Sequence, residues 1–124
     1  MKVVYHSVTG NIPRFLAKCG IEGGSIAQAP PAAGPFILVT NTLGFGEVPP
    51  AVSAYLAQNG EWLWGVAASG NRNFGGNFGA AGRQIAEEYN VPLLLTFELA
   101  GTNEDVQTFC ERLWEIDAKL YRAK

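Results

Sequence analysis

Residues 36–50 read FILVTNTLGFGEVPP, and this stretch holds one complete unit of the pattern that repeats along the chain. Its first four residues are all apolar, which predicts a strand covered on both faces of a sheet. Residues 41–47 then form a polar, glycine-containing loop, and the prolines that follow open a helix. We expect Val52, Tyr55 and Leu56 to be the core-facing side chains of that helix. A buried strand that leads through a loop into a helix is the building unit of parallel α/β sheets.

The same alternation extends from this stretch toward both ends of the chain. Further strands are expected at residues 2–6, 25–28, 63–68 and 92–99. The apolar faces expected for three further helices are Ile12, Phe15, Leu16 and Cys19; Phe78, Ala81, Ile85 and Tyr89; and Val106, Phe109, Cys110, Leu113, Ile116 and Leu120. Thr102 is expected to cap the last helix, with Glu104 and Asp105 in its first turn. This pattern predicts an α/β fold: one domain over residues 1–124 with a doubly wound, five-stranded parallel sheet in the flavodoxin-like order 2-1-3-4-5 and three α/β/α layers.

Composition excludes several classes of protein. The 124 residues are 48% hydrophobic and 16% charged, which is too apolar for a disordered chain. The formal net charge is −2, so no basic excess marks a nucleic-acid-binding surface. No apolar run approaches the roughly 20 residues of a membrane span, and the N-terminus lacks the apolar stretch of a signal peptide. We therefore expect a cytoplasmic protein with no nucleic-acid or membrane partner.

The chain has two cysteines, Cys19 and Cys110, and one histidine, His6. This set is too small for a zinc site, so no metal ligands are expected. We expect both cysteines to be buried thiols in a reducing compartment. A disulfide between them requires the first and last helices to be neighbours.

Three loops follow the strands at the edge where this architecture binds ligands, which is the point where the strand order reverses. In residues 7–11, hydroxyl groups and unpaired N–H groups at a helix start suit an anion such as a phosphate monoester, held by neutral donors. In residues 41–47, two glycines flank Phe45, so the backbone can approach a planar ring and the Gly44 peptide can flip. Residues 69–76 add backbone donors, amides and a second aromatic side chain. Together the loops predict a flat heteroaromatic ring that carries a phosphate tail.

Several strings in the sequence resemble the NrdI family, which are flavodoxin-like FMN proteins that serve class Ib ribonucleotide reductase. The resemblance lies in residues 4–15, 40–49, 65–75, 91–92 and 97–102, and its most specific strings are SGNRNF and FELAGT. It implies that the reduced flavin reacts with O₂ and supplies superoxide to the dimanganese small subunit of the reductase, where a tyrosyl radical is assembled. It also implies that a flavin reductase, not identified by the sequence, supplies the electrons. The flavin carries the chemistry, so no catalytic side chain is expected.

The resemblance also implies which residues bind FMN. The phosphate is assigned to Ser7, Thr9, Gly10, Asn11 and the Ile12 amide, and the N5 edge and one ring face to Thr42, Leu43 and Gly44. The pyrimidine end is assigned to Ser69, Gly70 and Asn71, with Phe74 nearby, and Val8 and Asn41 complete the set of cofactor-binding residues. In the family the Gly44–Phe45 peptide reorients with the redox state. Two positions depart from related proteins: Asn41 stands where many members carry an aromatic residue, and Ile12 stands where electron-transfer flavodoxins have a hydroxyl.

Three alternatives remain open on the residues alone. An electron-transferring flavodoxin is usually longer and strongly acidic, whereas Glu47 is the only acidic residue here between Glu22 and Glu61. A receiver-type signalling domain needs acidic residues at the ends of the first and third strands, where this chain has His6 and Asn41. A partner-binding module without a cofactor is suggested by the absence of Lys and Arg from residue 19 to 71. Binding of FMN would distinguish a flavoprotein from a module without a cofactor. The two one-electron potentials of the flavin would distinguish this protein from an electron-transferring flavodoxin.

Overall fold

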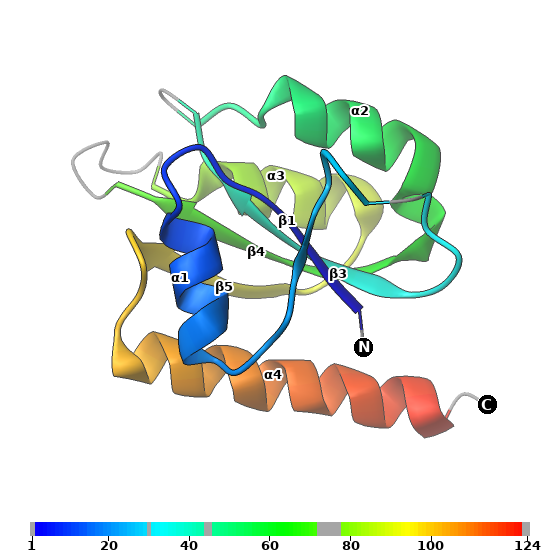
Figure 1. Ribbon diagram of the computed structural model, residues 1–124. Coiled ribbons are helices and arrows are strands. Elements are labelled where there is room, and N and C mark those ends of the chain that lie inside the picture. The colour runs from blue at the N-terminus through cyan, green and yellow to red at the C-terminus, as the bar shows by residue number, and fades with distance from the viewer. Residues whose placement is uncertain (1, 30, 44–45, 72–77, 123–124) are drawn as a thin grey trace.

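A computed structural model describes residues 2–29, 31–43, 46–71 and 78–122. Its elements in chain order are β1 (Lys2–His6), α1 (Asn11–Lys18), β2 (Gly24–Ser25), β3 (Phe36–Asn41), α2 (Pro50–Asn59), the short 3-10 helix η1 (Gly60–Trp62), β4 (Leu63–Gly70), α3 (Ala80–Tyr89), β5 (Leu93–Glu98) and α4 (Asn103–Arg122). The five strands form one parallel sheet in the order β2-β1-β3-β4-β5 (Figure 1). The predicted fold class and strand order are confirmed.

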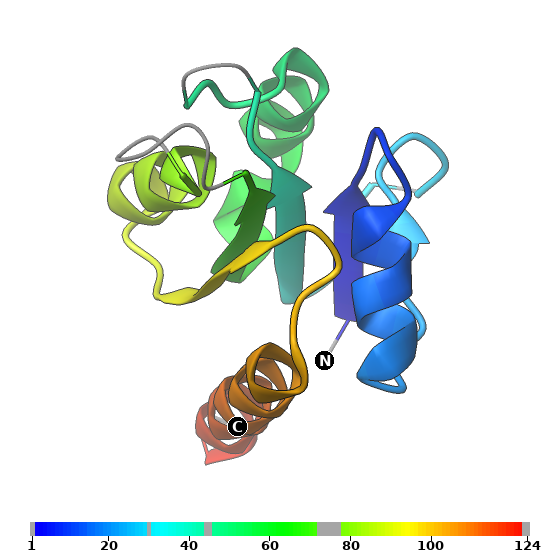
Figure 2. The same cartoon turned by 90° about the vertical axis from the view of Figure 1, so that its left-hand side faces the viewer.

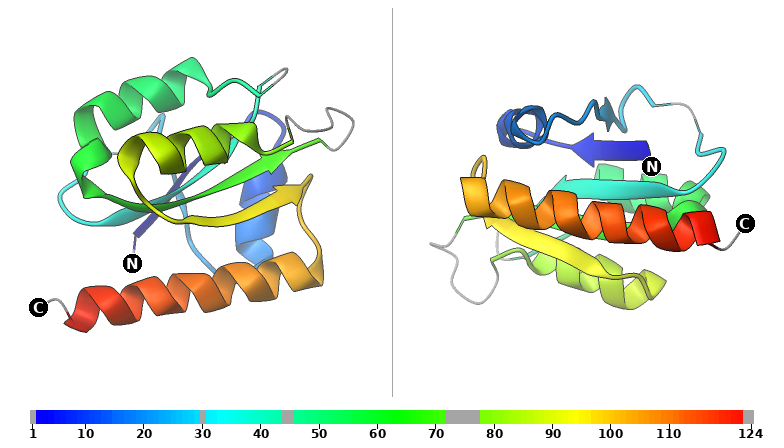
Figure 3. Two further views of the ribbon diagram at one scale, coloured as in Figure 1. Left: turned by 180° about the vertical axis from the view of Figure 1, so that it is seen from behind. Right: turned by 90° about the horizontal axis from the view of Figure 1, so that it is seen from below.

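Helices cover both faces of the sheet, with α1 and α4 on one face and α2 and α3 on the other (Figures 2 and 3). Successive strand residues point to opposite faces, so Ile37 and Val39 pack toward α1 and α4 while Phe36 and Leu38 pack toward α2 and α3. All four of these side chains are buried. Burial on both faces is the reason why the strand reads as an unbroken apolar run.

A second strand is present at the edge of the sheet as expected, but its predicted bounds, residues 25–28, are wrong. The strand comprises only Gly24 and Ser25, which pair with β1. The Ser25 carbonyl accepts hydrogen bonds from the N–H groups of Gln28 and Ala29, at 3.0 and 2.8 Å. The Ile26 N–H still donates to the Tyr5 carbonyl of β1 at 2.9 Å, so the chain turns away from the sheet after Ile26, where these local bonds replace the next rungs of the ladder.

The later strands also differ from the prediction at their ends. β4 continues two residues beyond residue 68, because Ser69 pairs with β3 on one side and Gly70 with β5 on the other. β5 ends at Glu98 because Leu99 adopts a left-handed conformation, with φ of 54°. Phe78 was expected on the inner face of the third helix, but it precedes α3. The left-handed Gly79, with φ of 68°, starts that helix after it.

Thr102 caps α4 as predicted, through two reciprocal hydrogen bonds. The Asp105 N–H donates to Thr102 Oγ1 at 3.1 Å, and the Thr102 N–H donates to Asp105 Oδ2 at 2.8 Å. This capping box satisfies two N–H groups that a helix start leaves without partners. Within the described ranges, no helix is both long and apolar enough to cross a membrane.

Replacing Thr102 with alanine is expected to lower the free energy of unfolding by about 1 kcal/mol, because the Asp105 N–H loses its acceptor. Urea unfolding followed by circular dichroism measures the change. Thr108→Ala, in the second turn of the same helix and beyond its cap, is the matched control and is expected to be neutral or slightly stabilising. Equal midpoints for the two variants would contradict the capping role.

Candidate functional site

A hollow of about 190 Å³ lies at the carboxyl ends of the strands, where the chain order reverses between β1 and β3. Its described lining comes from four strand ends: Val8, Thr9 and Asn11 after β1; Asn41 and Thr42 at β3; Ser69, Gly70 and Asn71 at β4; and Leu99 after β5. All of these except Leu99 were assigned to the cofactor by the sequence analysis. The fold thus brings together the three predicted loops and the end of β5, which are roughly 30 residues apart along the chain.

The first loop presents backbone donors at the start of α1. Gly10 caps the helix in a left-handed conformation, with φ of 82°, and its N–H donates to Ser7 Oγ at 3.2 Å. Helix geometry leaves the N–H groups of Asn11 and Ile12 without intrahelical acceptors. Pro13 has no N–H, so these two donors at the positive end of the helix dipole suit an anion. Ser7 organises the loop and is not among the residues that line the hollow.

Arg14 is a residue near this loop that the sequence analysis missed. Its Nη1 donates to Asn11 Oδ1 at 2.9 Å, so the guanidinium bends back toward the helix start. The loop was interpreted as carrying only neutral donors, but this contact brings a cation beside it. The signal was the spacing of three residues from Asn11 to Arg14, which places both side chains on one helix face.

A hydrogen bond between β1 and β3 fixes the side chain of Asn41. His6 Nδ1 donates to Asn41 Oδ1 at 2.6 Å, and the two residues end adjacent parallel strands. The bond uses the carbonyl end of the amide, so the NH₂ end of Asn41 is left for another partner. This chain therefore holds an oriented amide at the wall of the hollow.

Thr42 carries a buried hydroxyl, Oγ1, that has no hydrogen-bond partner among the described residues. Burying a hydroxyl without a hydrogen-bond partner costs free energy, so in folded proteins such a group is usually paired with a bound ligand or an ordered water molecule. Leu43 and Glu47 exchange two backbone hydrogen bonds of 2.9 Å, which hold together the base of the loop. Gly44, which was predicted to meet the ring, and Phe45, the second residue of the predicted redox-linked peptide, lie outside the described residues.

The third strand end is packed too tightly for a side chain at Gly70. A Cβ atom there would lie 2.9 Å from the Gly79 backbone nitrogen and 3.1 Å from Phe78 Cδ2. The Gly70 carbonyl accepts a hydrogen bond from the Leu99 N–H at 3.4 Å, and this bond holds Leu99 beside the hollow. No local signal marks Leu99 as a site residue, because only the sheet places it there. Phe74 lies outside the described residues.

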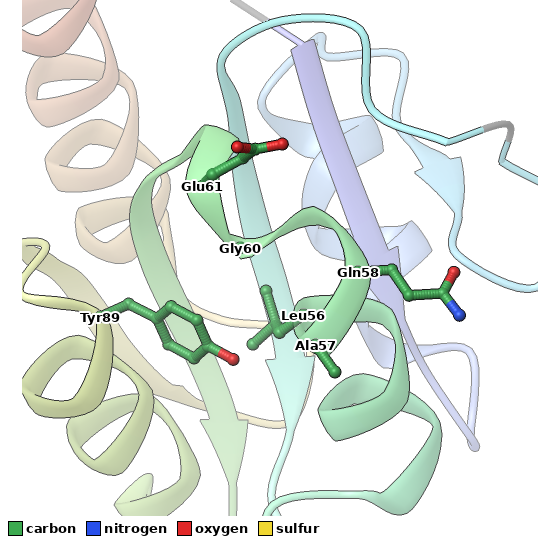
Figure 4. A pocket seen from close by; sticks show the side chains of 6 residues that line it. All are labelled: Leu56, Ala57, Gln58, Gly60, Glu61 and Tyr89. Atoms are coloured by element: carbon green, nitrogen blue, oxygen red, sulfur yellow. The ribbon is translucent and has the colours of Figure 1, made fainter.

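Larger hollows occur elsewhere on the molecule. One of about 460 Å³ lies at the end of α2, at the opposite end of the sheet, and Figure 4 shows the Tyr89 ring beside Gly60 and Leu56 within it. Another of about 420 Å³ lies along α4. Neither of these two is at the carboxyl ends of the strands. A third, of about 410 Å³, follows the end of β5 alone, over residues 98–102 and 105. The only orphaned hydroxyl found in the described ranges, Thr42 Oγ1, belongs to a residue that lines the smaller hollow at the point where the strand order reverses, so this hollow is the candidate ligand site. Across those ranges, no group of three or more His, Cys, Asp or Glu side chains is placed to hold a metal ion.

The parallel sheet in this order is the fold of the flavodoxin-like flavoproteins, and the chain is a protein of this class. A family model described as NrdI flavodoxin-like matches residues 3–111, so the chain belongs to the NrdI family. Proteins of this family and of the flavodoxins bind FMN, and FMN is the cofactor.

Solved structures of flavodoxins share the fold at low sequence identity. The flavodoxin of Streptococcus pneumoniae TIGR4 is 19% identical, with a TM-score of 0.73 over 95% of this chain and 97% of its own. Oxidised flavodoxin 1 from Bacillus cereus is 18% identical, with a TM-score of 0.68 over 94% and 95%. A short-chain flavodoxin associated with a bacterial microcompartment is 19% identical, with a TM-score of 0.69 over 92% and 95%.

The residues around the hollow fit FMN. The donors of Asn11 and Ile12 suit a phosphate monoester, and the buried Thr42 hydroxyl lacks the partner that a polar ring edge offers. Gly70 lines the hollow and has no side chain of its own to occupy it. The donor set is therefore of the kind that a flavin with a phosphate tail requires.

Proposed function

We propose that this protein activates class Ib ribonucleotide reductase, by delivering superoxide to the dimanganese small subunit for assembly of the tyrosyl radical. The observation that carries the proposal is the match of the NrdI family model over residues 3–111. When bound and reduced, FMN supplies the electrons that convert O₂ to superoxide. A separate flavin reductase restores the reduced state, and the metal and the radical belong to the partner.

In this proposal the first loop holds the phosphate. The N–H groups of Asn11 and Ile12 donate to it, and the hydroxyl of Thr9 adds a donor from the same hollow. Ser7 supports this arrangement, because its hydroxyl holds the Gly10 N–H and thereby shapes the turn. The guanidinium of Arg14 adds positive charge beside the loop.

The other two strand ends hold the ring. Thr42 offers its unpaired hydroxyl to a polar ring edge, and His6 orients the Asn41 amide against one face. Ser69, Gly70 and Asn71 lie at the end of β4 and take the pyrimidine end of the ring. Leu99 adds an apolar wall that limits the access of water. Val8, Leu43, Gly44 and Phe74 complete the proposed set.

The charge around the ring supports a protein that gives electrons to O₂. Crowded carboxylates disfavour an anionic reduced flavin, as in acidic flavodoxins. Here Glu47 is the only acidic residue between Glu22 and Glu61, so less repulsion opposes reduction. We expect the two one-electron potentials to lie closer together than in acidic flavodoxins, and a potentiometric titration measures both.

The direct test mixes the FMN-loaded, reduced protein with a manganese-loaded class Ib small subunit and O₂. Electron paramagnetic resonance is expected to show a tyrosyl radical only when the reduced protein is present. Superoxide dismutase should suppress the signal. A radical yield equal to that of the control without this protein would overturn the proposed activation, while FMN binding itself would stand.

A Thr42→Val variant tests the assignment of the ring edge, because valine keeps the shape and removes the hydroxyl. Without FMN the variant is expected to be as stable as the parent or more stable, since an unpaired buried hydroxyl is lost. With FMN it is expected to bind about fivefold to tenfold more weakly, which corresponds to about 1 kcal/mol for one hydrogen bond.

Quenching of flavin fluorescence on binding measures the dissociation constant, and thermal unfolding without FMN measures the stability. The two quantities are expected to change in opposite directions. A variant that loses stability without FMN yet binds FMN normally would show that the hydroxyl serves the fold and not the ligand.

A further inference from the structure

The two cysteines lie side by side, although 90 residues separate them in the chain. Cys19 closes α1, and Cys110 lies in the first half of α4. The Cys110 thiol is 3.9 Å from the Cys19 carbonyl oxygen, to which it donates a weak hydrogen bond. Figures 1 and 3 both show the C-terminal end of α1 beside α4. The condition for pairing is therefore met: the first and last helices are neighbours.

The surrounding core holds these helices in place. Phe15, one helical turn before Cys19, packs edge to face on Phe109, the neighbour of Cys110, with ring centroids 5.4 Å apart. Both rings are fully buried. The positions of the two cysteines are thus set by the core and do not depend on flexible surface side chains.

The electrostatics of Cys19 depend on the Cys110 side chain. The pKa of Cys19 is raised to about 12, most strongly by burial and then by the charge of Cys110 and a hydrogen bond between the two side chains, against a lowering by Lys18. A hydrogen bond between the two side chains requires the sulfur atoms to be close. Both cysteines are free in this structure.

A small oxidant can reach this pair from solvent. Both cysteines are only partly buried. Cys110 also lines the hollow of about 420 Å³ on α4, together with Glu111, Trp114 and Glu115. Access through this hollow favours Cys110 as the first residue to react.

We propose that Cys19 and Cys110 are a peroxide-sensitive thiol pair, whose oxidation forms a disulfide that joins α1 to α4. The Cys110 thiolate attacks hydrogen peroxide, an S–O bond forms as the O–O bond breaks, and the released hydroxide leaves as water after protonation. The Cys19 sulfur then attacks the Cys110 sulfur, the S–O bond breaks, and a second water leaves. Two thiols are oxidised by two electrons and one peroxide is reduced. This inference is independent of the proposed function.

The order of attack follows from the same environment. Because its pKa is near 12, Cys19 stays protonated near neutral pH and is slow to react with peroxide. It then acts as the resolving thiol. The final bond closes a loop from residue 19 to residue 110, so the oxidised protein is expected to unfold at a temperature higher by on the order of 10 °C.

The test treats the FMN-loaded full chain with hydrogen peroxide at low protein concentration and maps its peptides without reduction. We expect a peptide pair linked through Cys19 and Cys110, an intact mass lower by two hydrogen atoms, and full reversal by dithiothreitol. In Cys19→Ser, Cys110 is expected to accumulate as a sulfenic acid that dimedone traps. In Cys110→Ser, only Cys19 is left to react, and the rate of peroxide consumption is expected to be at least tenfold lower than in the parent protein.

Three results would overturn the proposal: two unlinked cysteines after the parent protein has consumed peroxide, a link between two chains in place of one within a chain, or equal dimedone labelling of the parent and of Cys19→Ser. A fourth result would also contradict the proposal. If the disulfide between Cys19 and Cys110 forms within one chain but lowers the unfolding temperature, the bond does not fit the native positions of the two helices. FMN absorbance, recorded in parallel, shows that each sample remains folded.

Discussion

Replacing Phe15 with alanine is expected to lower the free energy of unfolding by about 3–5 kcal/mol, the largest loss of stability that we expect from a single truncation. The Phe15 ring is fully buried in the core between α1, α4 and the sheet. It stacks on Phe97 with ring centroids 4.1 Å apart and meets Phe109 edge to face. Alanine would leave a cavity where three aromatic side chains meet, since the packed helices cannot collapse to fill it.

Urea unfolding at constant temperature measures this loss. The matched control is Trp114→Ala, which also truncates an aromatic side chain on a helix but one that is 72% exposed. Its unfolding free energy is expected to stay within about 0.5 kcal/mol of the parent. Similar losses for both variants would contradict the position of Phe15 at the centre of the core.

The second large effect is expected on the cofactor. Gly70→Ala should weaken FMN binding at least tenfold, or about 1.4 kcal/mol in binding free energy. The added Cβ would lie 2.9 Å from the backbone nitrogen of Gly79, a distance that backbone cannot accept without moving. Because Gly70 lines the hollow between Ser69 and Asn71, the shift would displace the donors that we assign to the pyrimidine end.

Titration of the apoprotein with FMN, followed by fluorescence, gives the dissociation constants. Gly24→Ala is the matched control, because a Cβ at Gly24 meets nothing within 4 Å and this residue lies on the edge strand. Its affinity for FMN is expected to equal that of the parent. If the Gly70→Ala protein is folded and binds FMN with unchanged affinity, the end of β4 is not part of the FMN site.

Much of the fold could be predicted because its signals are local. The apolar run at residues 36–39 marks a strand buried on both faces, and β3 extends only one residue beyond the predicted end at residue 40. Thr102 and Asp105 have the spacing of a capping box, which the structure confirms. The errors at the strand ends have two different causes. β4 gains two residues because of non-local pairing with β3 and β5, whereas β2 ends at Ser25 because a local turn over residues 25–29 competes with the ladder.

The candidate site could be predicted loop by loop, but not in its side-chain contacts. Glycine and hydroxyl residues after each strand identified the loops, and most of the residues chosen line one hollow. The hydrogen bond from His6 to Asn41 was not predictable, because it joins strands that are neighbours only in the folded sheet. Leu99 was missed for the same reason, since no sequence pattern marks a leucine that reaches the hollow from the end of β5.

By itself, the sequence determined the alternation of strands and helices, the loops that end each strand and the resemblance to the NrdI family, because periodicity and short motifs depend only on residues close in the chain. The tertiary structure alone decided which distant groups meet: the orphaned Thr42 hydroxyl, the His6–Asn41 hydrogen bond and the neighbouring thiols of Cys19 and Cys110. These depend on the crossing of strands and the packing of helices, whose contacts have no fixed separation along the sequence.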